Sequence, residues 1–305
     1  MASTSIKRLV TAGVVASSLV LLGSRVMADT AADIEQFYSL GTAVTYDNAS
    51  GDYPVITAIL SKPGLSGGHQ FTSYSFLAED SSGSLDIFVA TNVLSAVGAG
   101  GYGGLAQAPA VGDMLSASGQ WSPFSGIPEM GFVTVPASNN SITKISSGNA
   151  VPAPTVTTVA QLTNLVTGGL MTPTTFTAGA ASLAGTYVQL NNVTITPSSG
   201  NATDAFATTF PMDIAGQNTV GNETYNMTDS SGTMIMFDQV TSYSMAAAMG
   251  GSAVPTAPVT IYGVVDDFAG TAEFIPIKIV PEPSTFAMAA AGLLGCFTLL
   301  RKRRK

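Results

Sequence analysis

A duplicated segment constrains the fold of this chain more than any other feature. The stretch YSFLAEDSSGSLDIF at residues 74–88 recurs as ETYNMTDSSGTMIMF at residues 223–237, with Asp-Ser-Ser-Gly in the same place. In each copy a small-residue stretch follows, and then the spacing Gly-x6-Gly-x2-Glu, which falls on Gly119, Gly126 and Glu129 and on Gly263, Gly270 and Glu273. Two units with this order indicate an internal duplication. The chain is therefore predicted to contain two domains of the same fold.

Each unit carries the signals of a small β-barrel. Apolar and polar residues alternate on both sides of Asp-Ser-Ser-Gly, a sequence suited to a tight turn, which predicts a β-hairpin. The predicted strands cover residues 53–60, 74–79, 84–89, 114–121 and 128–133, and then 187–195, 224–229, 233–237, 258–265 and 272–279. Five strands with a short helix between the third and fourth are the order of an OB-fold. The predicted fold class is mainly β, with two tandem five-stranded OB-fold-like barrels.

The first 28 residues have the pattern of a secretory signal peptide. Lys7 and Arg8 precede an apolar stretch at residues 9–22, and small residues lie near residues 26–28. Cleavage is expected between Ala28 and Asp29. The alternatives, a buried helix or an uncleaved anchor, are disfavoured because the run is short for a membrane span and is interrupted by Ser and Gly.

The C-terminal 26 residues, VPEPSTFAMAAAGLLGCFTLLRKRRK, have a different character. A Pro-Glu-Pro tripeptide is followed by an apolar run at residues 284–300 and five consecutive basic residues at 301–305. As a helix the apolar run is about 25 Å long, which can cross a bilayer with flanking anchors. Basic residues beside a span resist translocation, so residues 301–305 are expected in the cytoplasm and the body outside it. A peripheral helix with a solvated end would leave the uninterrupted basic cluster unexplained.

This order of tripeptide, apolar span and basic cluster resembles the PEP-CTERM sorting signal of Gram-negative bacteria. The resemblance implies that Pro281, Glu282 and Pro283 are recognised by an exosortase, a membrane cysteine protease that cuts near them. The protein would be anchored transiently in the cytoplasmic membrane and then passed to the envelope, the outer surface or the medium. The resemblance also implies an association with exopolysaccharide and biofilm. The tripeptide is thus a sorting and processing site on which another enzyme acts.

The body resembles the OB-fold modules of bacterial secreted nucleases and surface proteins. The matching residues are Phe76, Asp80 and Gly83, then Val111-Gly112-Asp113 and Gly119; the second copy lacks Val-Gly-Asp.

Between the units, apolar residues at helical spacing over residues 156–166 predict a short helix with Thr157 or Thr158 as its N-cap. The predicted domains are therefore the signal peptide at 1–28, the first barrel at 29–149, the linker helix and second barrel at 150–280, and the sorting signal at 281–305.

The distribution of charge disfavours nucleic acid as a partner. Residues 29–280 carry three basic and 18 acidic residues, a net charge of −15, and the three bases are Lys62, Lys144 and Lys278. Such a surface repels a phosphate backbone.

The single cysteine, Cys296, excludes an intrachain disulfide.

Candidates for catalysis are few. His69 is the single histidine and is expected in a loop, without the neighbours that a metal ligand or a general base needs. The adjacent carboxylates Glu79-Asp80 and Asp266-Asp267 should point to opposite faces of their strands, and no Gly-x-Ser-x-Gly elbow occurs. We predict a protein that is not an enzyme and needs no cofactor or metal. Calcium binding through Asp80, Asp86, Asp266 or Asp267 stays open, although no Asp-x-Asp-x-Asp-Gly loop is present.

The predicted function is that of an exported, non-catalytic envelope or extracellular-matrix protein. Trp121 and Phe124 lie where OB-folds commonly meet ligands and could stack on a sugar, with Phe268 as the aromatic side chain of the second copy; packing in the core is the simpler role. One alternative is an extracellular hydrolase or its accessory module. A second is an OB-fold protein that binds single-stranded nucleic acid.

Overall fold

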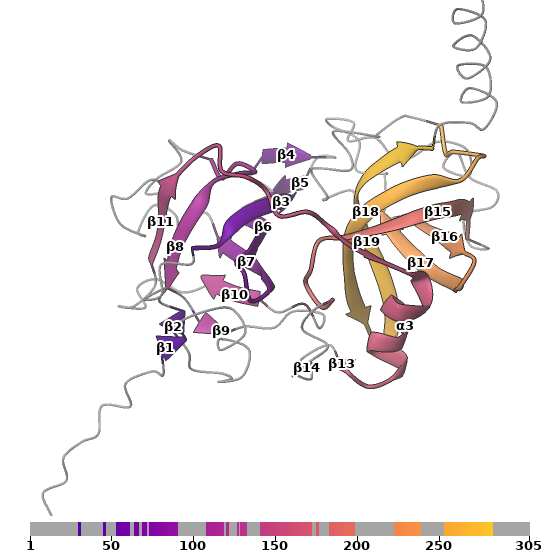
Figure 1. The fold of residues 1–305 in the computed structure, drawn as a ribbon, viewed down its shortest axis with the longest axis horizontal. Helices are drawn as coiled ribbons and strands as arrows, with labels where there is room; N and C mark the ends of the chain where they lie inside the picture. The colour runs from indigo at the N-terminus through magenta and orange to yellow at the C-terminus, as the bar shows by residue number, and fades with distance from the viewer. Residues whose placement is uncertain are drawn as a thin grey trace, which may run out of the picture.

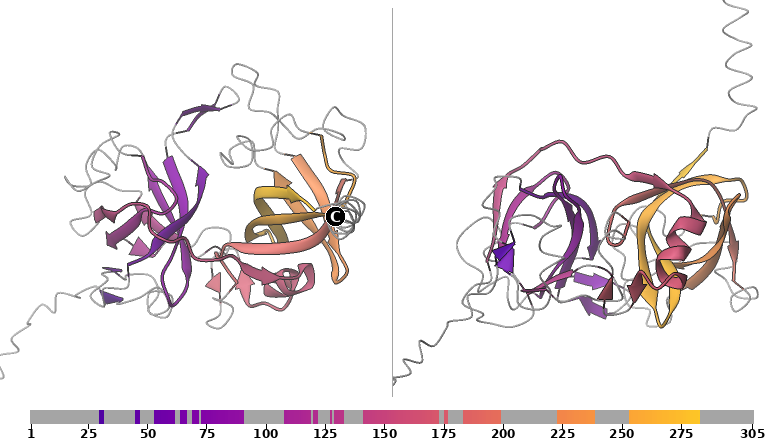
Figure 2. Two further views of the ribbon diagram at one scale, coloured as in Figure 1. Left: turned by 45° about the horizontal axis from the view of Figure 1, so that its top comes forward. Right: turned by 60° about the horizontal axis from the view of Figure 1, so that its bottom comes forward.

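In the computed structural model the chain forms two curled β-sheets that lie side by side (Figure 1). The structure describes residues 30–31, 45–46, 53–61, 64–66, 69–71, 73–90, 108–118, 120–121, 127, 129–132, 141–172, 175–176, 183–198, 223–238 and 253–282. The predicted mainly-β fold class is confirmed. Figure 2 shows the same arrangement in two further views, with one sheet at each end of the body.

The second sheet is a closed barrel whose strands follow the OB-fold order. Its five strands pair in the sequence β15-β16-β17-β19-β18, and β18 pairs again with β15. The β17–β19 pairing is parallel and the other pairings in the ring are antiparallel. A sixth strand, β12, pairs with β15 in parallel. The bounds are β12 Thr155–Thr157, β15 Val188–Pro197, β16 Glu223–Asp229, β17 Gly232–Asp238, β18 Val259–Phe268 and β19 Thr271–Pro281.

The first sheet has the same connectivity in a less regular form. Its order is β11-β8-β3-β6-β7-β10-β9, and β7 pairs with β10 in parallel. The strands are β3 Val55–Ser61, β6 Ser73–Glu79, β7 Ser84–Ala90, β8 Met114–Ser118, β9 Gln120–Trp121, β10 Glu129–Phe132 and β11 Ser141–Ser146. Only Gly119 separates β8, the second strand of this order, from β9 at its far end, so the chain itself links the two sides of the sheet. The first sheet therefore curls back on itself in the same order as the barrel.

Three short ladders accompany the sheets. They pair β1 Thr30–Ala31 with β2 Thr45–Tyr46, β4 Gly64–Ser66 with β5 His69–Phe71, and β13 Met171–Thr172 with β14 Thr175–Phe176. His69, expected in a loop, is instead the first residue of β5, and its backbone pairs with Ser66.

The repeated residues occupy equivalent positions in the two sheets. Asp80 and Asp229 each form the turn between the second and third strand of their unit. In both turns the Asp Oδ1 accepts hydrogen bonds from two backbone N–H groups and from the hydroxyl of the second Ser. Glu129 and Glu273 each lie on the strand that pairs in parallel with the third strand. The topology therefore agrees with an internal duplication.

One α-helix, α3 Val159–Thr167, lies in the described part of the chain and packs on the second barrel. It begins three residues later than the start of the predicted segment, because Thr155–Thr157 pair with β15 as strand β12. Thr158 is the N-cap and forms a capping box with Gln161. It is one of the two N-cap residues that the sequence predicted. The predicted helix between the third and fourth strands falls outside the described residues.

The repeated turn of the second unit also caps this helix. Asp229 Oδ2 accepts from Val159 N at 2.9 Å, and Ser231 Oγ accepts from Ala160 N at 2.9 Å. Burial favours a higher pKa for Asp229, but hydrogen bonds from Ser231, Val159 and Gly232 outweigh it, so the pKa lies below its ordinary value. The carboxylate is thus ionised where the helix N-terminus stabilises negative charge.

An apolar cluster joins the two sheets. It contains Ala58, Leu60, Leu77 and Ile127 from the first unit and Val264, Ile275 and Ile277 from the second, with Tyr187 packed against it. Polar contacts cross the same interface: Glu79 Oε1 accepts from Tyr187 N at 3.2 Å, and the Ser84 hydroxyl lies 2.9 Å from the carbonyl oxygen of Gly185. These contacts hold the two units together as one body.

Within the described residues, no helix has the length and the apolar character that a membrane crossing requires. The predicted signal peptide and the predicted apolar span at residues 284–300 both fall outside those residues.

Candidate functional site

The sorting tripeptide begins inside the second barrel. Pro281 is the last residue of β19 and pairs with Val259 of β18. The next residue, Glu282, is half-buried, and its Oε1 accepts from Asn192 N at 2.7 Å. The Thr260 hydroxyl lies 3.3 Å from the same oxygen. Two residues of the tripeptide are therefore held against the barrel, while Pro283 lies outside the described residues.

A bulge in β15 supplies the donor for Glu282. The register between β15 and β18 shifts between Leu190 and Val193, and Asn192 has a φ of 55°. Asn is one of the few residues that adopt this left-handed conformation at low cost. An N–H group freed from strand pairing by a bulge can bond elsewhere, and this one bonds the carboxylate. Asn192 and Thr260 were not predicted from the sequence, because neither resembles a sorting motif and the contact between Asn192 and Glu282 spans 90 positions.

A pair of buried carboxyl groups lies inside the first sheet. Asp86 on β7 is opposite Glu129 on β10, and their exposed fractions are 5% and 6%. Both oxygens of Asp86 lie within hydrogen-bond distance of the Ser75 hydroxyl, at 2.8 and 2.9 Å. Burial raises the pKa of both groups, and each charge would also oppose the other, so at neutral pH the pair retains a proton.

The second barrel contains a corresponding pair built from a different residue. Glu273 occupies the place of Glu129, but its neighbour on the third strand is Ile235, and the facing carboxyl is Asp266 of β18. Burial, and then the proximity of Glu273 and Asp267, raises the pKa of Asp266 to about 8. Asp266 Oδ1 is buried without a hydrogen-bond partner. Acidic residues in otherwise apolar strands are the sequence signal that could have identified both pairs.

In each of the pairs Glu79-Asp80 and Asp266-Asp267, the two neighbouring carboxylates have different contacts. Asp267 Oδ1 accepts from Gly270 N at 2.7 Å and closes the β18–β19 hairpin, while Asp266 faces Glu273. Glu79 lies at the interface of the units, and burial raises its pKa to about 7. Asp80 belongs to the repeated turn. In the described part of the chain, Asp80, Asp86, Asp266 and Asp267 form no cluster suited to a metal ion.

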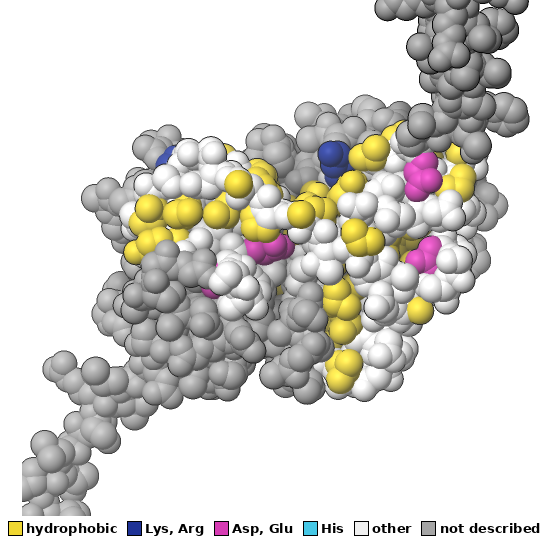
Figure 3. Space-filling model, viewed as in Figure 1, with side chains coloured by type: hydrophobic (Ala, Val, Ile, Leu, Met, Phe, Trp, Pro, Cys, Tyr) yellow, Lys and Arg dark blue, Asp and Glu magenta, His cyan; other side chains and the backbone are white. Residues whose placement is uncertain are grey.

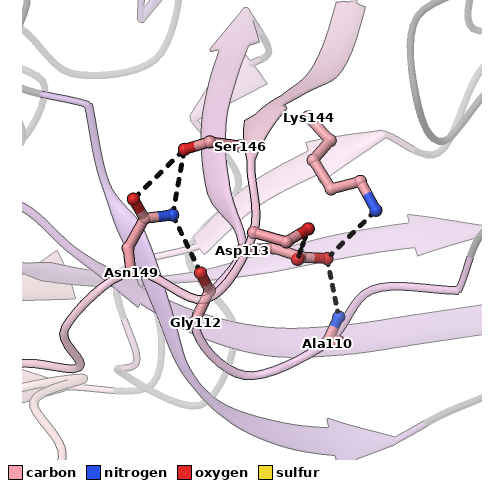
Figure 4. Close-up of polar contacts among 7 residues, drawn as sticks. Ala110, Gly112, Asp113, Lys144, Ser146 and Asn149 are labelled. Carbon is pink, nitrogen blue, oxygen red and sulfur yellow. Dashed lines mark hydrogen bonds and ion pairs between the residues drawn. The ribbon is translucent and has the colours of Figure 1, made fainter.

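The Val-Gly-Asp motif of the first unit stabilises a turn (Figure 4). Asp113 accepts from Ala110 N at 3.1 Å and from the Ser147 hydroxyl at 2.6 Å, and Lys144 Nζ lies 3.8 Å from it. The Gly112 carbonyl accepts from Asn149 Nδ2 at 2.9 Å. The motif therefore ties the start of β8 to the segment that leads into the second unit.

Several predicted residues cannot be placed as side chains. Trp121 belongs to β9 and its backbone pairs with Met130, but its side chain is outside what the structure describes. Phe124, Ala28 and Asp29 lie outside the described residues. Phe268, the aromatic residue of the second copy, lies at the end of β18 and is 63% exposed.

Three solved structures illustrate remote similarities to this chain. A murine DNA-binding protein bound to double-stranded DNA shares 11% identity, with 75% of this chain and 99% of that chain covered and a TM-score of 0.31. A p204 HINb domain shares 9% identity over 74% and 94% of the two chains, with a TM-score of 0.28. A replication protein A heterotrimer bound to single-stranded DNA shares 13% identity over 89% and 73%, with a TM-score of 0.20. At these TM-scores the similarities support no conclusion about a ligand.

Comparison of the sequence with protein families identifies a motif that begins at the end of β19. No curated protein matches the chain. A protein-family comparison, however, matches residues 280–304 to the PEP-CTERM protein-sorting motif. This match covers the tripeptide, the apolar run and four of the five residues of the basic cluster. The chain therefore carries a PEP-CTERM sorting motif, which implies export through the membrane to the cell envelope or surface and processing by an exosortase.

Proposed function

We propose that this protein is a non-catalytic structural or adhesive component of the cell envelope or extracellular matrix, associated with exopolysaccharide. The sorting motif at the end of β19 carries this proposal. Because the motif continues the last strand of the barrel, the two joined units are the cargo that sorting delivers. A compact β-body with a packed interface suits a structural or adhesive role outside the cell.

The contacts of Lys144 and Lys278 favour a neutral glycan over nucleic acid as the ligand. Lys144 lies beside the buried Asp113, and Lys278 lies over the ring of Tyr262, with its Nζ 5.5 Å from the ring centroid. Among the described residues on the face drawn in Figure 3, most side chains are hydrophobic or uncharged, and few are basic. Single-stranded nucleic acid is bound through a basic groove together with stacking aromatic residues. A neutral sugar needs no basic groove and can stack on an exposed aromatic ring, which Phe268 offers.

The carboxyl pairs argue against the hydrolase alternative. A glycosidase needs two carboxyl groups that reach the substrate from opposite sides of the scissile bond. Asp86, Glu129, Asp266 and Glu273 each have an exposed fraction of 8% or less and lie between paired strands. Their raised pKa values follow from burial rather than from an open cleft.

Binding assays with the exported protein test this proposal. We expect weak retention on purified host exopolysaccharide and no binding to a single-stranded oligonucleotide at ~0.15 M salt, where repulsion still extends over about 8 Å. Phe268→Ala should reduce retention on the glycan. Val156→Ala, at an apolar residue that is also 63% exposed, should not. Submicromolar oligonucleotide binding, or glycan retention equal in all three proteins, would contradict the proposal.

A further inference from the structure

We infer that Asn192 and Thr260 are positioning residues that hold the sorting motif against the second barrel, so that an exosortase gains access only when the end of β19 detaches. The inference rests on the sorting function and concerns the same site. A protease binds its substrate as an exposed, extended segment. Here the start of that segment is already engaged by the chain's own barrel.

Two kinds of contact hold the motif. The first is strand pairing, since Val280 pairs with Thr260 and Pro281 with Val259 on β18. The second is the carboxylate contact of Glu282. The Asn192 N–H donates to it at 2.7 Å, and a hydrogen bond to a charged group is stronger than one between neutral groups. Asn192 therefore makes the principal contact.

Thr260 makes the weaker contact. Its single hydroxyl proton is shared between Glu282 Oε1 and Asn191 Oδ1, each at 3.3 Å. Asn191 is itself held by the side-chain amide of Gln189 at 2.7 Å. The carboxylate therefore meets one strong donor from the bulge in β15 and one shared donor from β18.

The detachment is a local event. Ile279 is 5% exposed and belongs to the apolar core of the barrel, whereas Val280 is half-buried and Pro281 is exposed. The core therefore holds the strand as far as Ile279. Opening of the end of a strand needs much less free energy than global unfolding. The open state that an exosortase requires is one in which residues 280–282 leave the barrel while the rest stays folded.

The contact holds the second barrel close to the start of the predicted membrane span. Only Pro283 separates Glu282 from the apolar run that begins at residue 284. While the contact is closed, the folded barrel therefore stands next to the residues at which processing occurs. Release of residues 280–282 would free the carboxylate and let the barrel move away from them.

The test measures processing of the full-length chain in a host that contains an exosortase, by pulse-chase and mass spectrometry. Asn192→Pro removes the N–H and cannot adopt the positive φ, whereas Asn192→Gly keeps both. Thr260→Val removes the hydroxyl, whereas Thr260→Ser keeps it. We expect processing to be about 10-fold faster in Asn192→Pro and about 3-fold faster in Thr260→Val. Asn192→Gly and Thr260→Ser should be processed at the wild-type rate.

Two controls separate this role from general destabilisation and from tether length. Gly270→Ala lowers stability at the opposite end of the β18–β19 hairpin and should leave processing unchanged. A Gly-Ser-Gly-Ser insertion between Val280 and Pro281 frees the tripeptide, so Thr260→Val should have no further effect in that background. Equal processing rates of Thr260→Val and Thr260→Ser in proteins of equal melting temperature would overturn the inference alone. A wild-type chain that is never processed would overturn the sorting function together with it.

Discussion

Replacing Gly263 with Ala should lower the free energy of unfolding by about 3 kcal/mol, as forced overpacking does in a closed core. A Cβ at this position would overlap the carbonyl oxygen of Ile275 and lie 2.6 Å from ring carbons of the fully buried Phe274. Gly263 pairs with Val188 on one side and Pro276 on the other, so β18 cannot move away from either neighbour without breaking pairing. Chemical denaturation of the exported protein measures the loss.

Gly270→Ala is the matched control for this substitution. Gly270 has a φ of +86°, and a Cβ there would meet no atom within 4 Å, so its cost is conformational strain alone, about 1 kcal/mol. The loss in the free energy of unfolding should be clearly larger for Gly263→Ala than for Gly270→Ala. Equal losses in the two variants would mean that close packing at the β18–β19 contact is not what requires the glycine.

The second prediction is that Asp266→Asn makes the protein more stable at neutral pH, by on the order of 2 kcal/mol. The folded pKa of Asp266 is raised to about 8 by burial, and then by Glu273 and Asp267. The ordinary value in an unfolded chain is about 4. Between these two values the folded protein holds a proton that the unfolded chain has released. The contribution of Asp266 to stability is therefore complete below about pH 4 and is lost as the pH rises through about 8.

The variant should have a flatter dependence of stability on pH than the wild type. Asn has the shape of the protonated acid and no proton to lose, so the gain should be small at pH 5 and larger at pH 7 and 8. Asp113→Asn is the control, because this aspartate is equally buried but has Lys144, Ser147 and Ala110 as partners. That variant should be less stable than the wild type. Chemical denaturation of the three proteins at several pH values measures these free energies of unfolding. A stability gain for Asp266→Asn that does not grow with pH would contradict the prediction.

The hairpins could be predicted because their information is local. Alternation around Asp-Ser-Ser-Gly and the spacing Gly-x6-Gly-x2-Glu identified both sheets, and the strands of the structure lie within a few residues of the predicted ones. The N-cap at Thr158 could be predicted for the same reason. Pairing of Thr155–Thr157 with β15 could not, because it depends on residues more than 30 positions away.

The interface between the units, the carboxyl pairs and the attachment of the sorting motif depend on contacts that the sequence does not show. Ile275 and Ile277 read as ordinary strand residues, yet they pack against the other unit, and this pairing of surfaces has no local signature. Asp86 and Glu129 become a pair only through the parallel register of β7 and β10. Asn192 reaches Glu282 only because the barrel closes. The sorting motif itself could be predicted in full, since it is a contiguous signal, but its attachment to the barrel could not.

The predicted domain boundaries and both cleavage positions stay predictions, and they bear directly on the central claim that the barrels are the cargo of the sorting motif. Intact-mass measurement of the exported protein, with sequencing of both ends, tests that claim most directly. The account predicts a chain that starts at Asp29 and ends near Pro283, with the barrels complete and the apolar run and basic cluster removed. An exported form that still carries residues 301–305 would contradict it.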